Sequence, residues 1–143
     1  DTFRIKFDRF MFSRRQGKAS LMVMAYHPGN AEYGYTEQPV TVQFPFENKQ
    51  GKQQTITFAE MADLSVGAGP VALQATSDAG RPVEFCVMAG PAVVKGDVLD
   101  LTAVPQGATF PVEVTVIAYQ WGRSTEPQVR SAKPVEQSFR ITG

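Results

Sequence analysis

Alternation of apolar and polar residues runs through almost the whole chain and restricts the fold more than any other feature. Phe3, Ile5 and Phe7 alternate with basic residues near the start. The pattern recurs at residues 40–44, 56–58, 71–75, 83–87, 99–101, 112–116 and 139–141. A period of two residues is typical of strands half buried in a sheet. Helical periodicity is nearly absent, so the sequence predicts an all-β fold.

Turn-forming residues separate the alternating segments. Pro28-Gly29-Asn30, Gly96-Asp97 and the segment 67–70 all contain glycine, proline or asparagine, which reverse the chain or interrupt strands. Many short strands at such spacings are typical of β-sandwiches. The one candidate helix, residues 58–62, is too short to be stable without tertiary contacts, because helix nucleation is costly. We expect a loop or a single turn there.

Part of the sequence is repeated. Residues 23–29 (VMAYHPG) match residues 116–122 (VIAYQWG) at valine, at the Ala-Tyr pair and at glycine. Downstream, residues 37–44 match residues 132–139 at a Pro-Val pair and a phenylalanine, after an intervening loop that differs by two residues in length. Upstream, the strand-like segments 2–7 and 96–101 lie at nearly equal distances from the Ala-Tyr pairs. Three strands therefore recur twice.

The simplest account of the repeat is a partial unit followed by a complete one. Residues 1–46 would form the last three strands of one sandwich, and residues 52–143 a whole sandwich. Three strands with one apolar face leave that face and an edge uncovered. Preceding strands, a second copy or the complete unit would have to cover them. The alternative is one enlarged sandwich of about ten strands, whose halves arose by duplication.

Several blocks in the second half resemble a known family. They are QTITF at residues 54–58, VALQATS at 71–77, GRPVEF at 80–85, AGPA at 89–92 and GDVL at 96–99. In this order and spacing, over residues 54–142, they resemble the small bacterial immunoglobulin-like repeats of MBG type. One departure lies at residues 121–123, where Trp-Gly-Arg replaces a commoner Asn/Ala-rich stretch.

The resemblance implies an immunoglobulin-like antiparallel β-sandwich over residues 52–143, with a partial three-strand immunoglobulin-like unit over residues 1–46. It also implies a non-catalytic spacer or interaction module of a larger bacterial protein. Such repeats stand in tandem on surface proteins, or are appended to extracellular enzymes that degrade polysaccharides. The expected location is therefore extracellular or at the cell surface, with the periplasm also open. The expected partners are neighbouring domains of the same polypeptide, and a polysaccharide is a further candidate.

Charge and composition argue against other classes of function. Fourteen basic residues balance fourteen acidic ones, so no net field attracts nucleic acid. No apolar run approaches the roughly 20 residues of a membrane-spanning helix, so we expect no membrane insertion. Cys86 and His27 are the only cysteine and histidine, whereas a structural zinc site needs about four such ligands. We expect no metal, no cofactor and no enzymatic activity.

Two loops that follow the repeated Ala-Tyr pair carry the candidate ligand-binding residues. These are Tyr33 and Tyr35 in the first loop, and Tyr119, Trp121 and Arg123 in the second. Aromatic rings with a polar edge suit half-wet contact surfaces, and Trp and Arg often anchor interfaces. The alternative to a spacer is therefore a carbohydrate-binding module that assists a polysaccharide-active enzyme.

Structural roles compete with binding at these positions. Tyr26 and Tyr119 end strands at equivalent places in the repeat, which favours packing at the end of a sandwich. Trp121 aligns with Pro28 rather than with another aromatic residue, so the repeat gives it no shared structural role. It is therefore the stronger candidate for contact with a ligand or a neighbouring domain. Cys86 alternates out of phase with Phe85 and is expected on the opposite face of its strand.

Overall fold

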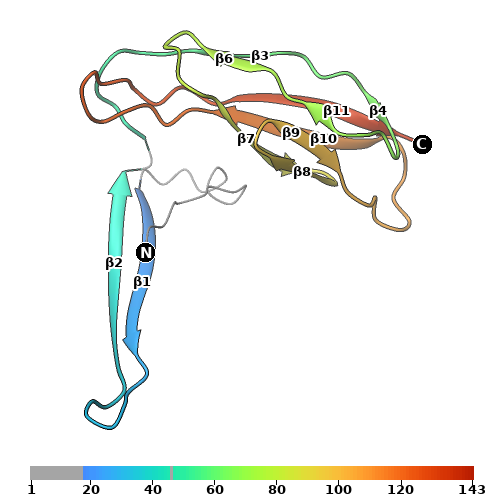
Figure 1. Ribbon diagram of the computed structural model, residues 1–143. Helices are drawn as coiled ribbons and strands as arrows, with labels where there is room; N and C mark the ends of the chain where they lie inside the picture. The colour runs from blue at the N-terminus through green and yellow to red at the C-terminus, as the bar shows by residue number, and fades with distance from the viewer. Residues whose placement is uncertain (1–17, 46) are drawn as a thin grey trace. The chain divides into compact units, whose positions relative to one another are not determined.

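The computed structural model describes residues 18–45 and 47–143, and every regular element among them is a β-strand (Figure 1). The all-β prediction is therefore confirmed for this part of the chain. Residues 58–62, where a loop or single turn was expected, contain no helix: Phe58 ends a strand and residues 59–62 form a loop. The chain divides into two compact units. One is Arg15–Glu47, which we call the hairpin unit, and the other contains Asn48–Gly143, which we call the sandwich unit.

The hairpin unit consists of two long antiparallel strands, β1 (Lys18–His27) and β2 (Thr36–Pro45). They pair over their full length, and β2 contains the alternating segment predicted at residues 40–44. In the described residues β1 and β2 hydrogen-bond only to each other. The third strand predicted for the partial unit, residues 2–7, lies outside the described residues, so two of the three strands are described.

One layer of the sandwich unit is a four-stranded sheet in the order β4-β11-β10-β7. Its strands are β4 (Leu64–Ser65), β7 (Glu84–Ala89), β10 (Val112–Tyr119) and β11 (Val135–Thr142). β10 pairs antiparallel with both β11 and β7, whereas the short β4 runs parallel to β11. The two longest strands, β10 and β11, lie at the centre, where both their edges are hydrogen-bonded.

The opposite layer consists of two small antiparallel sheets. β3 (Ile56–Phe58) pairs with β6 (Ala75–Ser77), and β9 (Val98–Leu101) lies between β5 (Val71–Ala72) and β8 (Ala92–Lys95).

The segment 71–75, which reads as one strand in the sequence, is divided between these two sheets. Leu73 N donates to Asp97 O (2.7 Å) beside β9, and Ala59 N donates to Gln74 O (2.9 Å) beside β3. The chain therefore crosses from one sheet to the other between Leu73 and Gln74. Alternation alone does not reveal the crossing, because Val71, Leu73 and Ala75 keep a period of two and Leu73 is buried in the core.

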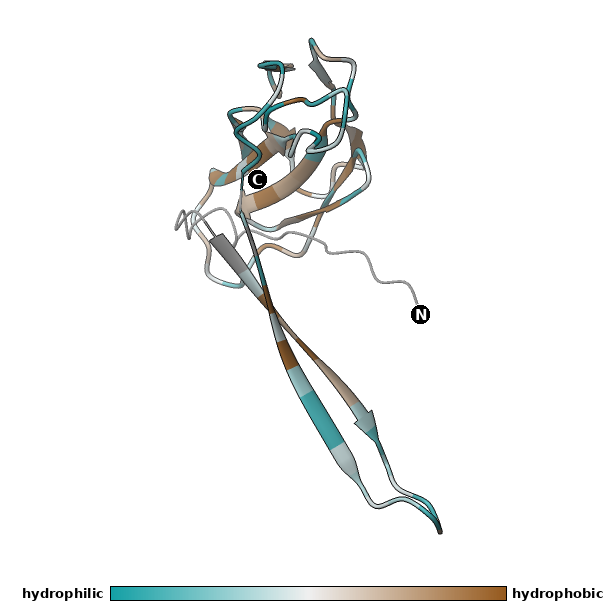
Figure 2. Cartoon of the chain, turned by 90° about the vertical axis from the view of Figure 1, so that its left-hand side faces the viewer, coloured by the Kyte–Doolittle hydropathy of each residue, from teal (hydrophilic) through white to brown (hydrophobic). Residues whose placement is uncertain are grey.

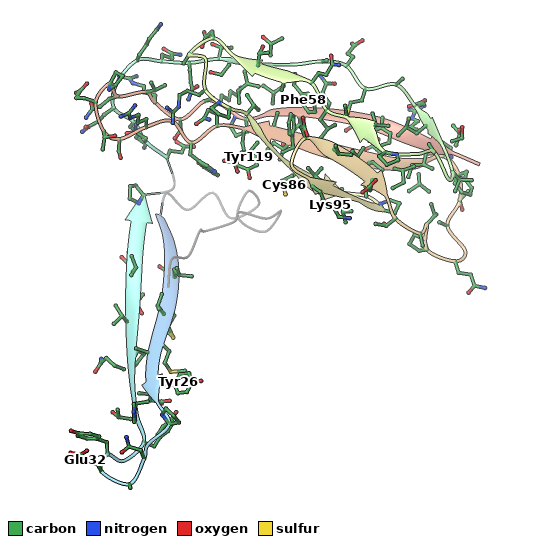
Figure 3. The ribbon with its side chains drawn as sticks, in the orientation of Figure 1. Tyr26, Glu32, Phe58, Cys86, Lys95 and Tyr119 are labelled. Atoms are coloured by element: carbon green, nitrogen blue, oxygen red, sulfur yellow. The ribbon has the colours of Figure 1, made fainter. Side chains whose placement is uncertain are left out.

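One hydrophobic core lies between the two layers. The four-stranded sheet contributes Val114, Val116, Ala118, Phe139 and Ile141, and the other layer contributes Ile56, Phe58, Leu73, Ala92 and Leu99. Phe58 is labelled among these side chains in Figure 3. Burying a side chain the size of Val, Leu or Ile stabilises a fold by about 1.5–3 kcal/mol. Two sheet layers around this core make the unit a β-sandwich.

Candidate functional site

A second apolar cluster lies on the face of the four-stranded sheet that points away from the core. Successive residues of a strand face opposite ways, so Ile117 and Tyr119 point away from Val116 and Ala118. Ile117 is 1% exposed and Tyr119 is 3% exposed. They pack with Cys86, Met88 and Trp121, and we call these five residues the outer cluster.

Cys86 belongs to this cluster, whereas its neighbours Phe85 and Val87 pack against the core. The prediction that Cys86 faces the opposite side from them is confirmed. Figure 3 shows Cys86 and Tyr119 on the neighbouring strands β7 and β10.

Tyr119 is fixed by both packing and hydrogen bonding. It lies opposite Glu84 in the β10–β7 register, and its hydroxyl donates to Glu84 Oε2 at 3.1 Å. Burial, together with the negative charge of Glu84, raises the pKa of Tyr119 well above its ordinary value. The phenol is therefore neutral near pH 7 and acts as a donor to the carboxylate. These contacts are those of a packed structural tyrosine.

Trp121 is half-buried and packs against Tyr119. The centroids of the two rings are 5.4 Å apart, with an interplanar angle of 54°. Such a tilted arrangement is favourable for aromatic pairs. The backbone carbonyl of Trp121 also accepts a hydrogen bond from Ser131 Oγ (2.7 Å). The structure thus brings together two of the predicted binding residues, but packs their rings on each other.

Arg123, the third predicted residue in this loop, forms an isolated antiparallel β-bridge with Val129. Its N donates to Val129 O (2.8 Å), and Val129 N donates back to Arg123 O (3.0 Å). Its Nε donates to Thr125 Oγ1 at 3.0 Å. The guanidinium is therefore engaged within its own loop.

Asn48 holds the same loop in place from the opposite end of the unit's sequence. Its side-chain amide donates to Arg123 O (2.8 Å) and Val129 O (2.7 Å). Its backbone N donates to Ser131 Oγ at 2.8 Å. The Asn48 amide thus binds two backbone carbonyls of this loop, which helps to order it.

Gln54 provides a second, deeper anchor. It is 4% exposed, its Nε2 donates to Arg130 O (2.6 Å), and its Oε1 accepts from Ser77 Oγ (2.6 Å). A buried polar side chain without such partners would destabilise the fold. Sequence reasoning did not identify Asn48 or Gln54 as anchors. No local pattern signals these roles, because the partners lie far along the chain.

The other predicted residues, Tyr33 and Tyr35, lie in the loop between β1 and β2. Together with Tyr26 they are 60–68% exposed. The Tyr33 ring stands edge-on to His27, with ring centroids 6.5 Å apart. The Tyr35 hydroxyl donates to Glu37 Oε2 (2.7 Å), and this bond raises the pKa of Tyr35.

Asn30 orders this loop from within. Its Oδ1 accepts hydrogen bonds from the backbone N of Glu32 (2.9 Å) and of Tyr33 (2.8 Å). Figure 3 shows Glu32 at the tip of the hairpin and Tyr26 near the end of β1. His27 Nδ1 accepts from Gly29 N at 3.1 Å, so the histidine is part of the turn. The exposed tyrosines therefore project from a locally hydrogen-bonded loop.

The five predicted binding residues fall into two groups. Tyr33 and Tyr35 belong to the hairpin unit, and Tyr119, Trp121 and Arg123 belong to the sandwich unit. Each group is assembled within its own unit.

Two shallow hollows mark the surface of the sandwich unit. One, of about 250 Å³, is lined by residues 58–62, 64 and 71–74. The other, of about 300 Å³, is lined by Asp63, Glu113, Ser138, Phe139 and Arg140. Asp63 Oδ1 accepts a hydrogen bond from Arg140 N (2.8 Å), which ties the segment before β4 to β11. This carboxylate therefore has a structural contact.

Two further findings concern the described residues only. Among them, no three His, Cys, Asp or Glu side chains are grouped so that they could hold a metal ion. Within the same residues, no helix is long and apolar enough to cross a membrane.

No family model matches the chain, and no curated protein or solved structure matches it either. The fold itself defines the class of protein, an all-β sandwich with an attached β-hairpin. The resemblance to MBG-type repeats and the immunoglobulin-like character of the sandwich stay predictions from the sequence.

Proposed function

We propose that the chain is a non-catalytic structural spacer or interaction module of a larger bacterial secreted or cell-surface protein. The burial of Tyr119, which is only 3% exposed, carries this proposal. A surface that stacks on sugars has to present ring faces to solvent. In the sandwich unit the rings of Tyr119 and Trp121 pack on each other instead. Such an aromatic pair contributes to the stability of the fold.

The polar contacts of the sandwich unit support a non-catalytic role. Asp63 lines a hollow together with Glu113 and Arg140, and it accepts a hydrogen bond from the backbone N of Arg140. That hollow has a volume of about 300 Å³, at the lower end of the range for ligand pockets. The histidine is engaged in its own turn. Asp63 and His27 thus both form hydrogen bonds that support the local fold, which favours a non-catalytic role.

The setting of the module follows from the sequence resemblance. We propose an extracellular or cell-surface location and, as partners, neighbouring domains of the same polypeptide. The balanced charge, with 14 basic and 14 acidic residues, supports protein contacts over a polyanionic partner.

Fluorescence of Trp121, the only tryptophan, tests this proposal. The purified chain is titrated with soluble bacterial, algal and host polysaccharides. We expect a blue-shifted emission maximum, because the ring is half-buried, and no saturable change with any polymer. A saturable shift that disappears in Trp121→Ala, with the fold intact by circular dichroism, would establish a carbohydrate-binding module instead.

A second candidate function rests on the hairpin loop. Tyr26, Tyr33 and Tyr35 are all at least 60% exposed within one short unit, as a sugar-stacking surface requires. Affinity electrophoresis in polysaccharide gels tests this alternative with the double variant Tyr33→Ala/Tyr35→Ala. Met22→Ala, at an exposed position within β1, is the matched control. Retardation of the wild type and of Met22→Ala, but not of the double variant, would favour carbohydrate binding by this loop.

A further inference from the structure

One end of the sandwich unit is rich in basic side chains. Three segments meet there, residues 48–54, 78–84 and 120–134, and we call them the basic end. Lys52 N donates to Gln128 O (3.0 Å), and Gln120 Nε2 donates to Pro82 O. Figure 1 shows these loops at the end of the unit away from the C-terminus. Their basic residues are Lys49, Lys52, Arg81, Arg123, Arg130 and Lys133.

The balanced total charge of the chain conceals this local excess. Against its six basic residues the basic end has three acidic ones, Asp78, Glu84 and Glu126, a net charge of +3. The rest of residues 48–143 has two basic residues against six acidic ones, a net charge of −4. A local excess of one sign attracts an oppositely charged partner even when the whole chain is neutral.

The cations of the basic end have no carboxylate partner among the described residues. The only ion pair found there joins Lys95 to Asp100 (3.7 Å), outside the basic end. The acidic residues of the basic end instead accept hydrogen bonds from uncharged donors. These bonds are Thr55 N to Asp78 Oδ1 (2.9 Å), Tyr119 hydroxyl to Glu84 Oε2 (3.1 Å) and Gln128 N to Glu126 Oε2 (3.3 Å).

The backbone holds two of these cations on either side of one residue. Lys52 and Arg123 each form an isolated β-bridge with Val129, one parallel and one antiparallel. Neighbouring strands lie about 4.8 Å apart and paired residues share a face, so the two side chains start roughly 10 Å apart on one side. The hydrogen bond from Arg123 Nε to Thr125 Oγ1 orients the guanidinium. The positions of these charges are therefore set before any partner binds.

The chemistry of the partner follows from what this end presents. Figure 2, which views the sandwich unit from this end, shows mostly hydrophilic loops. The rings of Tyr119 and Trp121 pack on each other, whereas nucleic acids and sugars are usually gripped by stacking on exposed rings. A uniform polyanion would also meet the repulsion of three fixed carboxylates. A protein segment can place acidic side chains opposite the cations and neutral ones opposite these carboxylates.

We propose that the basic end binds an acidic, extended segment of another protein domain, whose carboxylates pair with Lys52, Arg123 and Arg130. An arginine guanidinium matches a carboxylate with two parallel hydrogen bonds. Single exposed ion pairs are weak, so several must form together, and complementary charge sets orientation and specificity. The inference rests on the proposed role as an interaction module and names the partner of that role.

An acidic peptide tests the site on the full 143-residue chain. The probe is a synthetic peptide with four glutamates at alternate positions and neutral residues between them, and the control peptide has glutamine in their place. Amide shifts are followed by NMR. At low ionic strength we expect saturable shifts at residues 49–52 and 121–133, with a Kd of about 1 mM or below. Binding should weaken at least about tenfold at high salt, because salt screens exposed charges.

Two double variants with the same change in net charge separate a specific site from general attraction. Lys52→Glu/Arg130→Glu reverses charges in the basic end and should weaken binding at least tenfold. Lys95→Glu/Arg140→Glu reverses two charges elsewhere in the unit and should change the Kd less than twofold. If the first variant unfolds, Lys52→Gln/Arg130→Gln removes the charges without adding new ones and should weaken binding severalfold.

Three results would overturn the inference. The first is no saturable shift at the basic end while the chain stays folded at low ionic strength. The second is equal weakening by the two double variants, which reduces the effect to net charge. The third is tighter binding of tetragalacturonate, which also has four carboxylates, and this assigns the end to an acidic polysaccharide. Failure of the proposed function is a different result, a polysaccharide-induced fluorescence shift that Trp121→Ala abolishes, so the two failures are distinguishable.

Discussion

Residues 23–29 and 116–122 share four of seven residues and have opposite environments. Both are strand segments that run into a loop. Val23 is 46% exposed whereas Val116 is fully buried, and Tyr26 is 68% exposed whereas Tyr119 is 3% exposed. The comparison teaches that a similar local sequence forms a strand in both units. Burial of its side chains depends on which other strands are present.

The register of the two hairpins differs while the faces are preserved. Val23 lies opposite Val40, whereas Val116 lies opposite Gln137, the counterpart of Val42. The register therefore shifts by two residues relative to the aligned sequences. A shift by an even number keeps every side chain on its face, because the period of a strand is two. The hairpin unit thus retains the apolar face that forms a core in the sandwich.

The largest effect should separate the two equivalent valines. Val116→Asp places a carboxylate in the core and should destabilise the sandwich by about 4 kcal/mol or more, enough to unfold it. Val23→Asp, at a half-exposed position of β1, should leave the unfolding of the sandwich unit unchanged and the hairpin largely folded. Urea denaturation followed by Trp121 fluorescence measures the first effect, and hairpin amide shifts measure the second. Equal effects of the two substitutions on the sandwich would break the comparison.

Alanine substitution at the two equivalent glycines should destabilise both units, but by different amounts. Gly29 and Gly122 both have positive φ, +88° and +76°, which disfavours any side chain. An added Cβ at Gly122 would lie 2.6 Å from the Arg130 carbonyl carbon, whereas at Gly29 the nearest atom is Tyr35 N at 3.1 Å. We expect Gly122→Ala to destabilise the sandwich by about 2–3 kcal/mol and Gly29→Ala to destabilise the hairpin by about 1 kcal/mol.

Chemical denaturation reports the effect of Gly122→Ala, and residue-resolved hydrogen exchange reports that of Gly29→Ala. Gly67→Ala, at a positive-φ glycine with open space around it, is the control for backbone strain alone. A loss for Gly122→Ala no larger than for this control would argue against close packing of the loop.

The equivalent tyrosines should differ less. Tyr119→Phe removes the hydrogen bond to Glu84 and should lower the unfolding free energy by about 1 kcal/mol. Tyr26→Phe, at an exposed position, should change stability by less than about 0.5 kcal/mol. Urea denaturation compares both with the wild type. A neutral Tyr119→Phe would mean that packing alone holds the ring.

The smallest expected effect is a dependence on alkaline pH. The pKa of Tyr119 is raised in the folded state relative to about 10 in an unfolded chain. Its contribution to stability is therefore fully present below pH 10 and is lost as the pH rises further, because only the unfolded state then releases the proton. Between pH 10 and 11.5 the wild type should lose more stability than Tyr119→Phe. Tyrosinate absorbance should show a late step that this variant lacks, and equal losses would argue against the raised pKa.

Much of the fold could be predicted from local pattern. Alternation identified the strands around Val116 and Phe139, and it placed Cys86 on the face opposite Phe85. Two features were not predicted. The segment 71–75 divides between two sheets, and β4 adds to the edge of β11 in parallel. Both depend on hydrogen bonds to distant strands, and a two-residue strand such as β4 is too short to show a period.

The candidate site residues were likewise only partly predictable from the sequence. The sequence singled out Tyr119 and Trp121 by residue type and by their place in the repeat. It could not show that their rings pack on each other, since that requires the turn after β10 to fold back. Asn48 and Gln54 left no local signal, although each bonds to backbone 75–81 positions further along the chain.

The sequence by itself determined that this chain forms strands, where most of them lie and which face of each is apolar. These properties follow from a period of two residues and from turn residues, which act within a few positions of the chain. Only the tertiary structure decided that Val116 is buried and Val23 is half exposed. Burial requires apolar surface from distant segments, and the free energy gained depends on the area removed from water. The same strand pattern therefore forms a core in the sandwich unit and an exposed apolar face in the hairpin unit.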